Sequence, residues 1–251
     1  MKLSSGKLPP WILMRVLLRS FLLQASWNFE RMQSLGVLYV LAPALRVFYR
    51  DEDLVLACQR HLTYFNTHPF LASPILGTTL ALEEKRSRNE AAGSIDVDEF
   101  KAMIMAPYAA MGDAFFWGGI RPLAACVALY IALQGALWAP VVFLVLFNVP
   151  HLAFRIGGLV GGYTQGVRLT QVIQRFRLPD LAIRCKEGTV IFLGGLCASL
   201  VFKCLQGEKV WSGWGFTAIP VVVLLGWLGR KGVSNLILIL IFSGILLLLA
   251  R

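Results

Sequence analysis

Towards the C-terminus, apolar stretches without a formal charge locate predicted transmembrane helices. Residues 210–229 and 232–250 contain 20 and 19 residues without a charge. A helix that crosses the hydrocarbon core needs about 20 mostly apolar residues. Residues 188–202 form a shorter apolar run of 15 residues, which is marginal for a full crossing. The pattern therefore predicts two clear crossing helices and a third, shorter one.

The longest interval without a formal charge, residues 122–154, predicts a helical hairpin. Its 33 residues are too many for one straight crossing helix. Gly135, Pro140 and Pro150 lie inside it, and both residue types interrupt or bend helices. We expect two short or broken helices joined by a turn.

The first half of the chain contains two amphipathic segments. Near the N-terminus, Arg15 and Arg19 share one helical face, which predicts a helix that lies in the membrane interface. A second polar stripe follows at Ser20, Gln24, Asn28 and Arg31. In residues 51–65 apolar side chains recur at helical spacing after an acidic start, which predicts an amphipathic helix that ends before Pro69.

Two further apolar runs, residues 70–82 and 102–120, are interrupted by proline and glycine. The first has 13 residues, too few to cross a membrane, and we expect these runs to enter the membrane and return as re-entrant or broken hairpins. Residues 83–101 between them hold ten charged residues and are predicted to be solvated. Asp96 and Glu99 have the spacing of a capping box, so a helix is expected to begin just after Asp96.

The composition agrees with an all-α polytopic membrane protein. Hydrophobic residues make up 57% of the 251 residues and charged residues 15%, against about 45–50% and about 25% in soluble domains. These figures argue against a soluble enzyme, a disordered chain and a fibrous repeat. The net charge of +10 is interpreted as positive cytoplasmic loops rather than nucleic-acid binding.

Positive charge also predicts the orientation. Lysine and arginine gather in residues 166–187 and in the turn at Arg230 and Lys231, and such clusters stay on the cytoplasmic side. The N-terminus is then cytoplasmic, and the last helix leaves Arg251 outside. We expect one domain over residues 1–251, divided into an N-terminal interfacial region (1–34), a core with re-entrant hairpins (35–165), a cytoplasmic segment (166–187) and C-terminal transmembrane helices (188–251).

The segment of residues 111–122 holds the first candidate for chemistry. Asp113 lies between glycines and aromatic residues in an apolar stretch, and an ionisable residue at membrane depth suggests function. A carboxylate accepts hydrogen bonds from sugar hydroxyls, and Trp117 offers a ring on which a pyranose can stack. The alternative is that Asp113 caps a half-helix or pairs with Arg121. We expect Asp113, Trp117 and Arg121 to lie near the substrate path or the core hinge.

Two asparagines are further candidates for the same role. Asn66 lies between His61 and His68, which lack a third metal ligand nearby and more simply shape a turn or an interface. Asn148 precedes Pro150, where a polar side chain either contacts a ligand or satisfies the backbone at a kink. The glycine pairs of residues 157–162 have the small-xxx-small spacing of closely packed helices.

Four blocks, read together, resemble the IID membrane subunit of the mannose/fructose/sorbose family of the bacterial sugar phosphotransferase system. The blocks are RSFLLQASWNFERMQSLG (19–36), RHLTYFNTHPFLASPILGTTLALEE (60–84), MGDAFFWGGIRP (111–122) and LFNVPHLAFRIGGLVGGY (146–163).

The resemblance implies a non-catalytic translocation subunit in the bacterial inner membrane that needs no cofactor and no metal. IID subunits pair with a IIC subunit, and such pairs assemble into trimers. The sugar is phosphorylated by a IIB subunit that receives its phosphoryl group from IIA. We expect Trp27, Asn28, Glu30 and Arg31 to organise the IIC contact.

An alternative remains that the chain is an orphan IID-like protein that binds or regulates without transport. It rests on Ala106 and Ala110, which stand where family members carry glycine.

Overall fold

The computed structural model describes residues 8–90, 95–207 and 214–249. All its elements of regular secondary structure in these ranges are helices. The helices are α1 (Pro10–Ser20), α2 (Ser34–Phe48), α3 (Asp51–Arg60), α4 (Ala72–Ser87), α5 (Val97–Gly112), the π-helix η1 (Asp113–Ile120), α6 (Arg121–Leu133), α7 (Ala139–Gln165), α8 (Arg168–Arg175), α9 (Leu178–Gly207), α10 (Trp214–Arg230) and α11 (Asn235–Leu249). The chain divides into two compact units, Met1–Leu193 and Gly194–Arg251.

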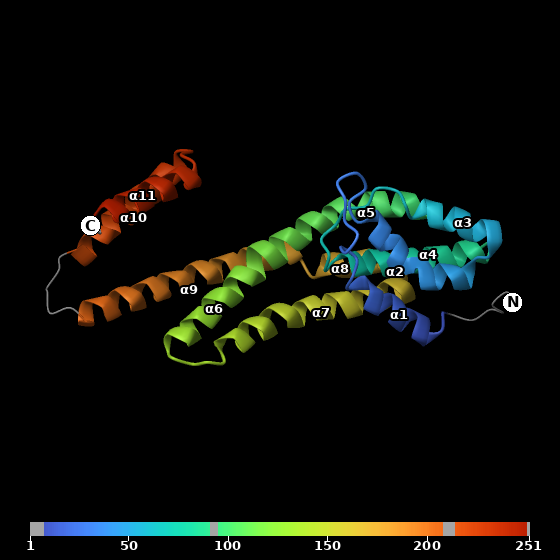
Figure 1. Ribbon diagram of the computed structural model, residues 1–251, viewed down its shortest axis with the longest axis horizontal. Coiled ribbons are helices and arrows are strands. Elements are labelled where there is room, and N and C mark those ends of the chain that lie inside the picture. Colours follow the sequence, from blue (N-terminus) through green and yellow to red (C-terminus); the bar gives the residue numbers. More distant parts are fainter. Residues whose placement is uncertain (1–7, 91–94, 208–213, 250–251) are drawn as a thin grey trace. The chain divides into compact units, whose positions relative to one another are not determined.

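Helix α4 lies at the centre of the first unit, between α7, α5 and α2 (Figure 1). Most of its side chains are buried, from Ala72 to Glu84. Its approach to α7 is close because glycines face each other: a Cβ on Gly162 would lie 2.6 Å from the carbonyl oxygen of Pro74. A Cβ on Gly158 would lie 2.5 Å from Cγ of the Pro74 ring. The predicted close packing of this glycine spacing is thus confirmed for one of its two pairs, and Gly157 has no neighbour within 4 Å.

Helices α5, η1 and α6 form one continuous helical run of 37 residues, Val97–Leu133. This run and α7 are the two helices of the described residues that are long and apolar enough to cross a membrane. They are joined by a turn at Gly135, whose φ of 83° favours glycine. The predicted turn between two helices in residues 122–154 is therefore confirmed, but the helices are neither short nor broken: α6 continues the 37-residue run, and Pro150 lies inside the 27-residue α7 without ending it.

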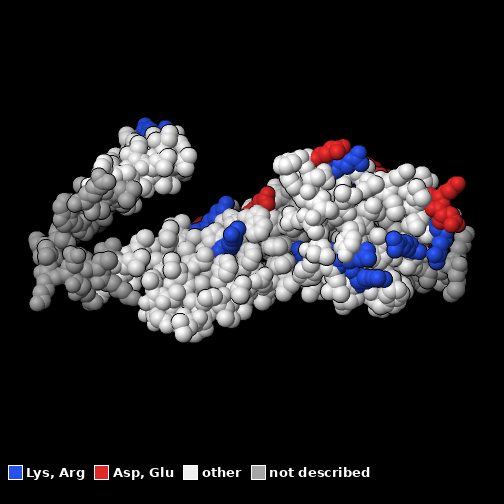
Figure 2. All heavy atoms as spheres, in the orientation of Figure 1, with Lys and Arg blue, Asp and Glu red and all other residues white. Residues whose placement is uncertain are grey.

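The hairpin of α6 and α7 presents an apolar surface. Large hydrophobic side chains near its turn are exposed, among them Leu137, Trp138, Val141, Leu144, Val145 and Val149. Towards this turn, the face visible in Figure 2 carries no charged side chain. Such a surface suits contact with lipid.

Several predicted boundaries differ from the structure. Helix α1 ends at Ser20, so the four-residue polar stripe does not lie on one helix. Helix α3 ends at Arg60 and not at residue 65, and residues 61–71 form a turn-rich connection. The predicted helix start after Asp96 is confirmed, since the Asp96 carboxylate accepts a hydrogen bond from the N–H of Asp98 at 2.8 Å.

The interrupted apolar runs of the first half are also more regular than expected. Residues 102–120 contain no turn and continue from α5 into η1. Residues 72–82 belong to α4, and the re-entry of residues 70–82 stays a prediction.

The second unit contains α10 and α11, which pack against each other across a turn at Gly232. They have 17 and 15 residues, and the crossings by residues 210–229 and 232–250 stay predictions. The apolar run 188–202 lies within α9, which is 30 residues long. Lys2, Lys7 and Arg251 lie outside the described residues.

Candidate functional site

The π-helix η1 is the most unusual element near the predicted site. Its eight residues widen the long helix at its middle, and π-helical turns are frequent at functional sites. Gly118 and Gly119 let α9 pack closely: a Cβ on Gly119 would lie 3.3 Å from Cβ of Cys185, and one on Gly118 would lie 3.4 Å from Cε of Lys186. The wide turn therefore carries Asp113 and Trp117 on a helix against which α9 packs.

Trp117 lies at the edge of an aromatic cluster and remains 40% exposed. Its ring stacks on Phe147 of α7 at 6.0 Å between centroids, and it lies 5.1 Å from His68 and 5.5 Å from Phe70. The Arg121 guanidinium lies 5.5 Å from the Trp117 ring centre, a cation–π distance. The structure thus brings Trp117 and Arg121 together.

Asp113 is exposed and has no ion-pair partner in the described part of the chain. It lies inside a continuous helical run, so it caps no helix N-terminus. Neither alternative for Asp113, a cap or a pair with Arg121, is realised. Its carboxylate is left available one turn away from Trp117.

The positions of Asn66 and Asn148 give less support to a contact with substrate. The Asn148 amide donates to the carbonyl oxygen of Leu144 at 2.9 Å, and its oxygen lies 3.4 Å from Nδ1 of His151. This local bonding matches the alternative that the amide serves the backbone near Pro150. Asn66 is exposed in the connection between α3 and α4, and no contact described in the structure joins it to Asp113.

A buried ionic cluster around Glu83 was missed by sequence reasoning. The Glu83 side chain is fully buried, although residues 83–101 were expected to be solvated. It accepts two hydrogen bonds of 2.9 Å from Arg60, one of 3.0 Å from His61 and one of 2.6 Å from Tyr49. Because Glu83 begins a run of charged residues, its burial was not expected. Its position directly after the apolar residues LAL (80–82) is the sequence feature that could have indicated burial.

The cluster defines the charge states of its members. Burial by itself raises the pKa of Glu83, but the hydrogen bonds from His61 and Arg60 outweigh it and lower this pKa to about 2. Burial lowers the pKa of His61, which is therefore neutral at pH 7. Lys101 of α5 completes the cluster, with its ammonium 3.1 Å from the Arg60 carbonyl oxygen and 2.8 Å from Asp98. The network joins α3, α4 and α5 behind the connection that carries Asn66 and His68.

Residues 26–33 form an ordered loop between α1 and α2. The Asn28 side-chain oxygen accepts hydrogen bonds from the N–H groups of Glu30 and Arg31 at 3.1 and 2.8 Å. Arg31 reaches the carbonyl oxygen of Leu62 at 3.3 Å. Trp27 is 43% exposed and packs edge-to-face on the more exposed Phe29. The hydrogen bonds of Asn28 and Arg31 thus hold a loop from which two aromatic side chains are exposed.

Known proteins are similar to this chain over most of its length. A family model described as "PTS system mannose/fructose/sorbose family IID component" matches residues 8–205. The mannose-specific EIID component of Escherichia coli strain K12 is 44% identical over 210 residues, which are 83% of this chain and 69% of that protein. The fructose permease IID component of Bacillus subtilis strain 168 is 36% identical over 211 residues, 82% of this chain and 70% of that protein.

Solved structures agree with these relatives. One described as the structure of a membrane protein has a TM-score of 0.73 and 33% identity, and covers 96% of both chains. The cryo-EM structure of the mannose transporter ManYZ with microcin E492 has a TM-score of 0.60 and 32% identity, again over 96% of both chains.

Proposed function

Since this chain belongs to the IID component family of the mannose/fructose/sorbose phosphotransferase system, a membrane component of sugar permeases, we propose that it pairs with a IIC subunit and carries a hexose-type sugar across the bacterial inner membrane. Phosphoryl transfer then belongs to IIA and IIB partners, and IIC–IID pairs assemble into trimers. The similarity to ManYZ, which is a mannose transporter, supports a sugar as the transported molecule.

The observation that carries the proposal is the pair of Asp113 and Trp117 on η1. Both side chains are exposed and lie four residues apart on one wide helical turn. A free carboxylate beside an accessible ring matches a sugar, whose hydroxyls donate hydrogen bonds while one ring face is apolar. Arg121 extends the polar side of this surface, and Asn66 and Asn148 are assigned to the path or the core hinge.

We assign the IIC contact to the loop of residues 26–33. Its exposed Trp27 and Phe29 resemble the aromatic anchors that dominate protein interfaces. Asn28, Glu30 and Arg31 shape the loop, and Arg31 fixes it to the residues before α4. The interfacial role of α1 and the orientation, with a cytoplasmic N-terminus and an outside C-terminus, belong to the same proposal. So do the four segments 1–34, 35–165, 166–187 and 188–251.

Sugar uptake in cells that contain the cognate IIC, IIA and IIB proteins tests the function. Asp113→Asn is expected to reduce labelled-sugar uptake at least about tenfold, because it removes the charge that strengthens hydroxyl hydrogen bonds. Asp53→Asn, at the exposed start of α3, is the matched control and should transport normally. Co-purification with IIC verifies assembly of each variant. Normal uptake by an assembled Asp113→Asn variant contradicts the assigned site.

The alternative of an orphan, non-transporting IID-like protein loses much of its basis. Ala106 and Ala110 lie on the exposed side of the continuous helix α5. Alanine is the best helix former, so these positions impose no strain on the observed backbone. A wild-type chain that co-purifies with IIC but supports no uptake would favour the alternative.

A further inference from the structure

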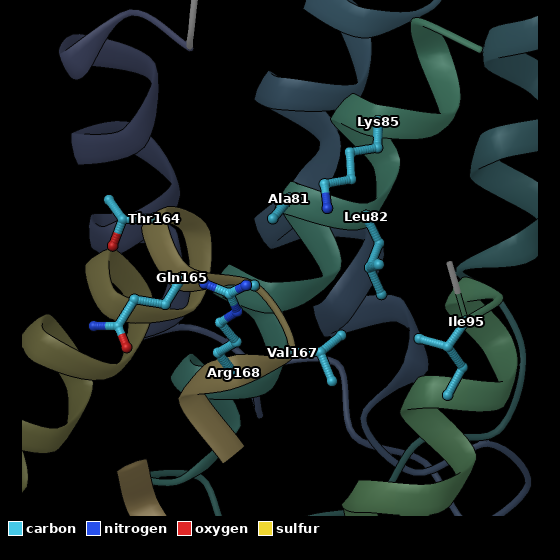
Figure 3. A pocket seen from close by; sticks show the side chains of 9 residues that line it. Ala81, Leu82, Lys85, Ile95, Thr164, Gln165, Val167 and Arg168 are labelled. Carbon is cyan, nitrogen blue, oxygen red and sulfur yellow. The ribbon is translucent and has the colours of Figure 1, made fainter. Parts of the chain in front are cut away.

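A cavity of about 780 Å³ lies between the C-terminal parts of α4 and α7 and the start of α8 (Figure 3). It is separate from the Asp113 and Trp117 surface. Its lining residues are Ala81, Leu82, Lys85, Ile95, Thr164, Gln165, Gly166, Val167 and Arg168. The cavity thus combines an apolar wall with two cationic side chains and polar groups.

The two cations are available to a ligand. In Figure 3 the amino group of Lys85 and the guanidinium of Arg168 reach toward the same space from different helices. Neither has an ion pair in the described part of the chain. The carboxylate next to Lys85 in sequence, Glu84, is held by Tyr163 at 2.6 Å and by Arg88. No acidic side chain is among the described residues that line the cavity.

The helix dipoles do not change the positive charge of the cavity. The C-terminal ends of α4 and α7 contribute partial negative charge, and the N-terminal ends of α8 and of α5, which begins two residues after Ile95, contribute partial positive charge. The two effects oppose each other, so the side chains of Lys85 and Arg168 decide the sign. The cavity is therefore suited to an anion.

The position of the cavity narrows the kind of anion. The candidate span α7 ends at Gln165, so Gly166, Val167 and Arg168 lie where a crossing helix leaves the membrane. Leu82, Ile95 and Val167 supply the apolar wall. A small hydrophilic anion makes no use of this wall, whereas a lipid has a phosphate at headgroup depth and acyl chains beside it.

We propose that this cavity binds an anionic phospholipid, with its phosphate between Lys85 and Arg168 and the upper part of its acyl chains on Leu82, Ile95 and Val167. The bound lipid would then contact both α4 and the C-terminal end of α7. The proposal requires only the membrane location of the chain and is independent of sugar transport.

Native mass spectrometry of the purified full-length protein, with its IIC partner where it co-purifies, tests the site. Palmitoyl-oleoyl phosphatidylglycerol is titrated against phosphatidylcholine of the same chains and against glycerol 3-phosphate, the headgroup without chains. The variant is Lys85→Gln with Arg168→Gln. Its matched control, Arg46→Gln with Arg50→Gln, removes the same charge from exposed positions near the end of α2 and directly before α3.

Wild-type protein and the control are expected to bind phosphatidylglycerol equally and in preference to phosphatidylcholine. The Lys85 and Arg168 variant should bind it about 30-fold more weakly, since each cation contributes about 1 kcal/mol near an anionic lipid. Equal binding by the variant and the wild type overturns the proposal. Equal competition by glycerol 3-phosphate also overturns it, because a phosphate site that ignores the chains is not a lipid site.

Discussion

Arg60 and Glu83 form a bidentate ion pair, in which Nε and one terminal nitrogen of Arg60 each donate to a different carboxylate oxygen at 2.9 Å. The pair joins the last residue of α3 to the buried helix α4. It stands beside the connection of residues 61–71, which supports the aromatic cluster under Trp117. Paired planar groups of this kind fix geometry as well as charge.

Removing the charge of Glu83 should strongly destabilise the protein. Glu83→Gln leaves the Arg60 guanidinium without its buried carboxylate, and breaking a buried pair typically costs about 3–5 kcal/mol. Thermal unfolding in detergent measures the loss. Arg86→Gln, which breaks the exposed pair with Asp96, is the control and should cost less than about 1 kcal/mol. Similar melting temperatures for both variants would contradict the structural role of the cluster.

The same cluster predicts a loss of stability in acid. Because the pKa of His61 is lowered in the folded protein, the unfolded chain takes up this proton first, and stability falls as pH drops below about 6.5. The Glu83 carboxylate adds a second loss below its unfolded value, as pH falls from 4.5 towards its folded pKa of about 2.

His61→Gln isolates the first of these two losses. Glutamine keeps an N–H donor for Glu83 but does not titrate. The melting temperature of the variant should therefore change less between pH 7 and pH 5 than that of the wild type. An unchanged slope would show that another group controls this range.

The glycines between α4 and α7 offer a matched pair of substitutions. Gly162→Ala places a Cβ 2.6 Å from the Pro74 carbonyl oxygen and 2.7 Å from the N–H nitrogen of Thr78, and such overpacking costs about 1–3 kcal/mol. Gly157→Ala on the same helix meets nothing within 4 Å and should not destabilise. Thermal unfolding of both variants separates close packing from helix propensity. Equal effects would refute the role of Gly162.

Trp117 should contribute to sugar affinity. Trp117→Ala removes the exposed ring, and an aromatic contact contributes about 0.5–1.5 kcal/mol beyond its area, which predicts binding about 2- to 12-fold weaker. Equilibrium binding of labelled sugar to the purified IIC–IID pair measures it. Trp138→Ala, at an exposed position in the turn before α7, is the control. If both variants bind as tightly as wild type, Trp117 does not contact the sugar.

The resemblance of four sequence blocks identified the family, and the family model and the relatives confirm it. Local signals also predicted local structure correctly. Asp96 begins α5 because its carboxylate bonds to a nearby N–H, and Gly135 marks the hairpin turn because its φ is positive. The charge-free interval 122–154 located the hairpin of α6 and α7, but the first of its two long helices begins at Val97, in a segment that was expected to be solvated.

Only the tertiary structure decided the features that depend on distant residues. Glu83 looks like one charge among ten in residues 83–101, and it is buried because Arg60, His61 and Tyr49 from other helices satisfy its oxygens. Residues 113–120 read as an interrupted run, yet they form a π-helix against which α9 packs at Gly118 and Gly119. The sequence by itself determined the family, the start of α5 and the hairpin turn at Gly135, because those depend on neighbouring residues. Packing decided which charges are buried and where Asp113 and Trp117 are exposed, because those depend on contacts between residues far apart in the chain.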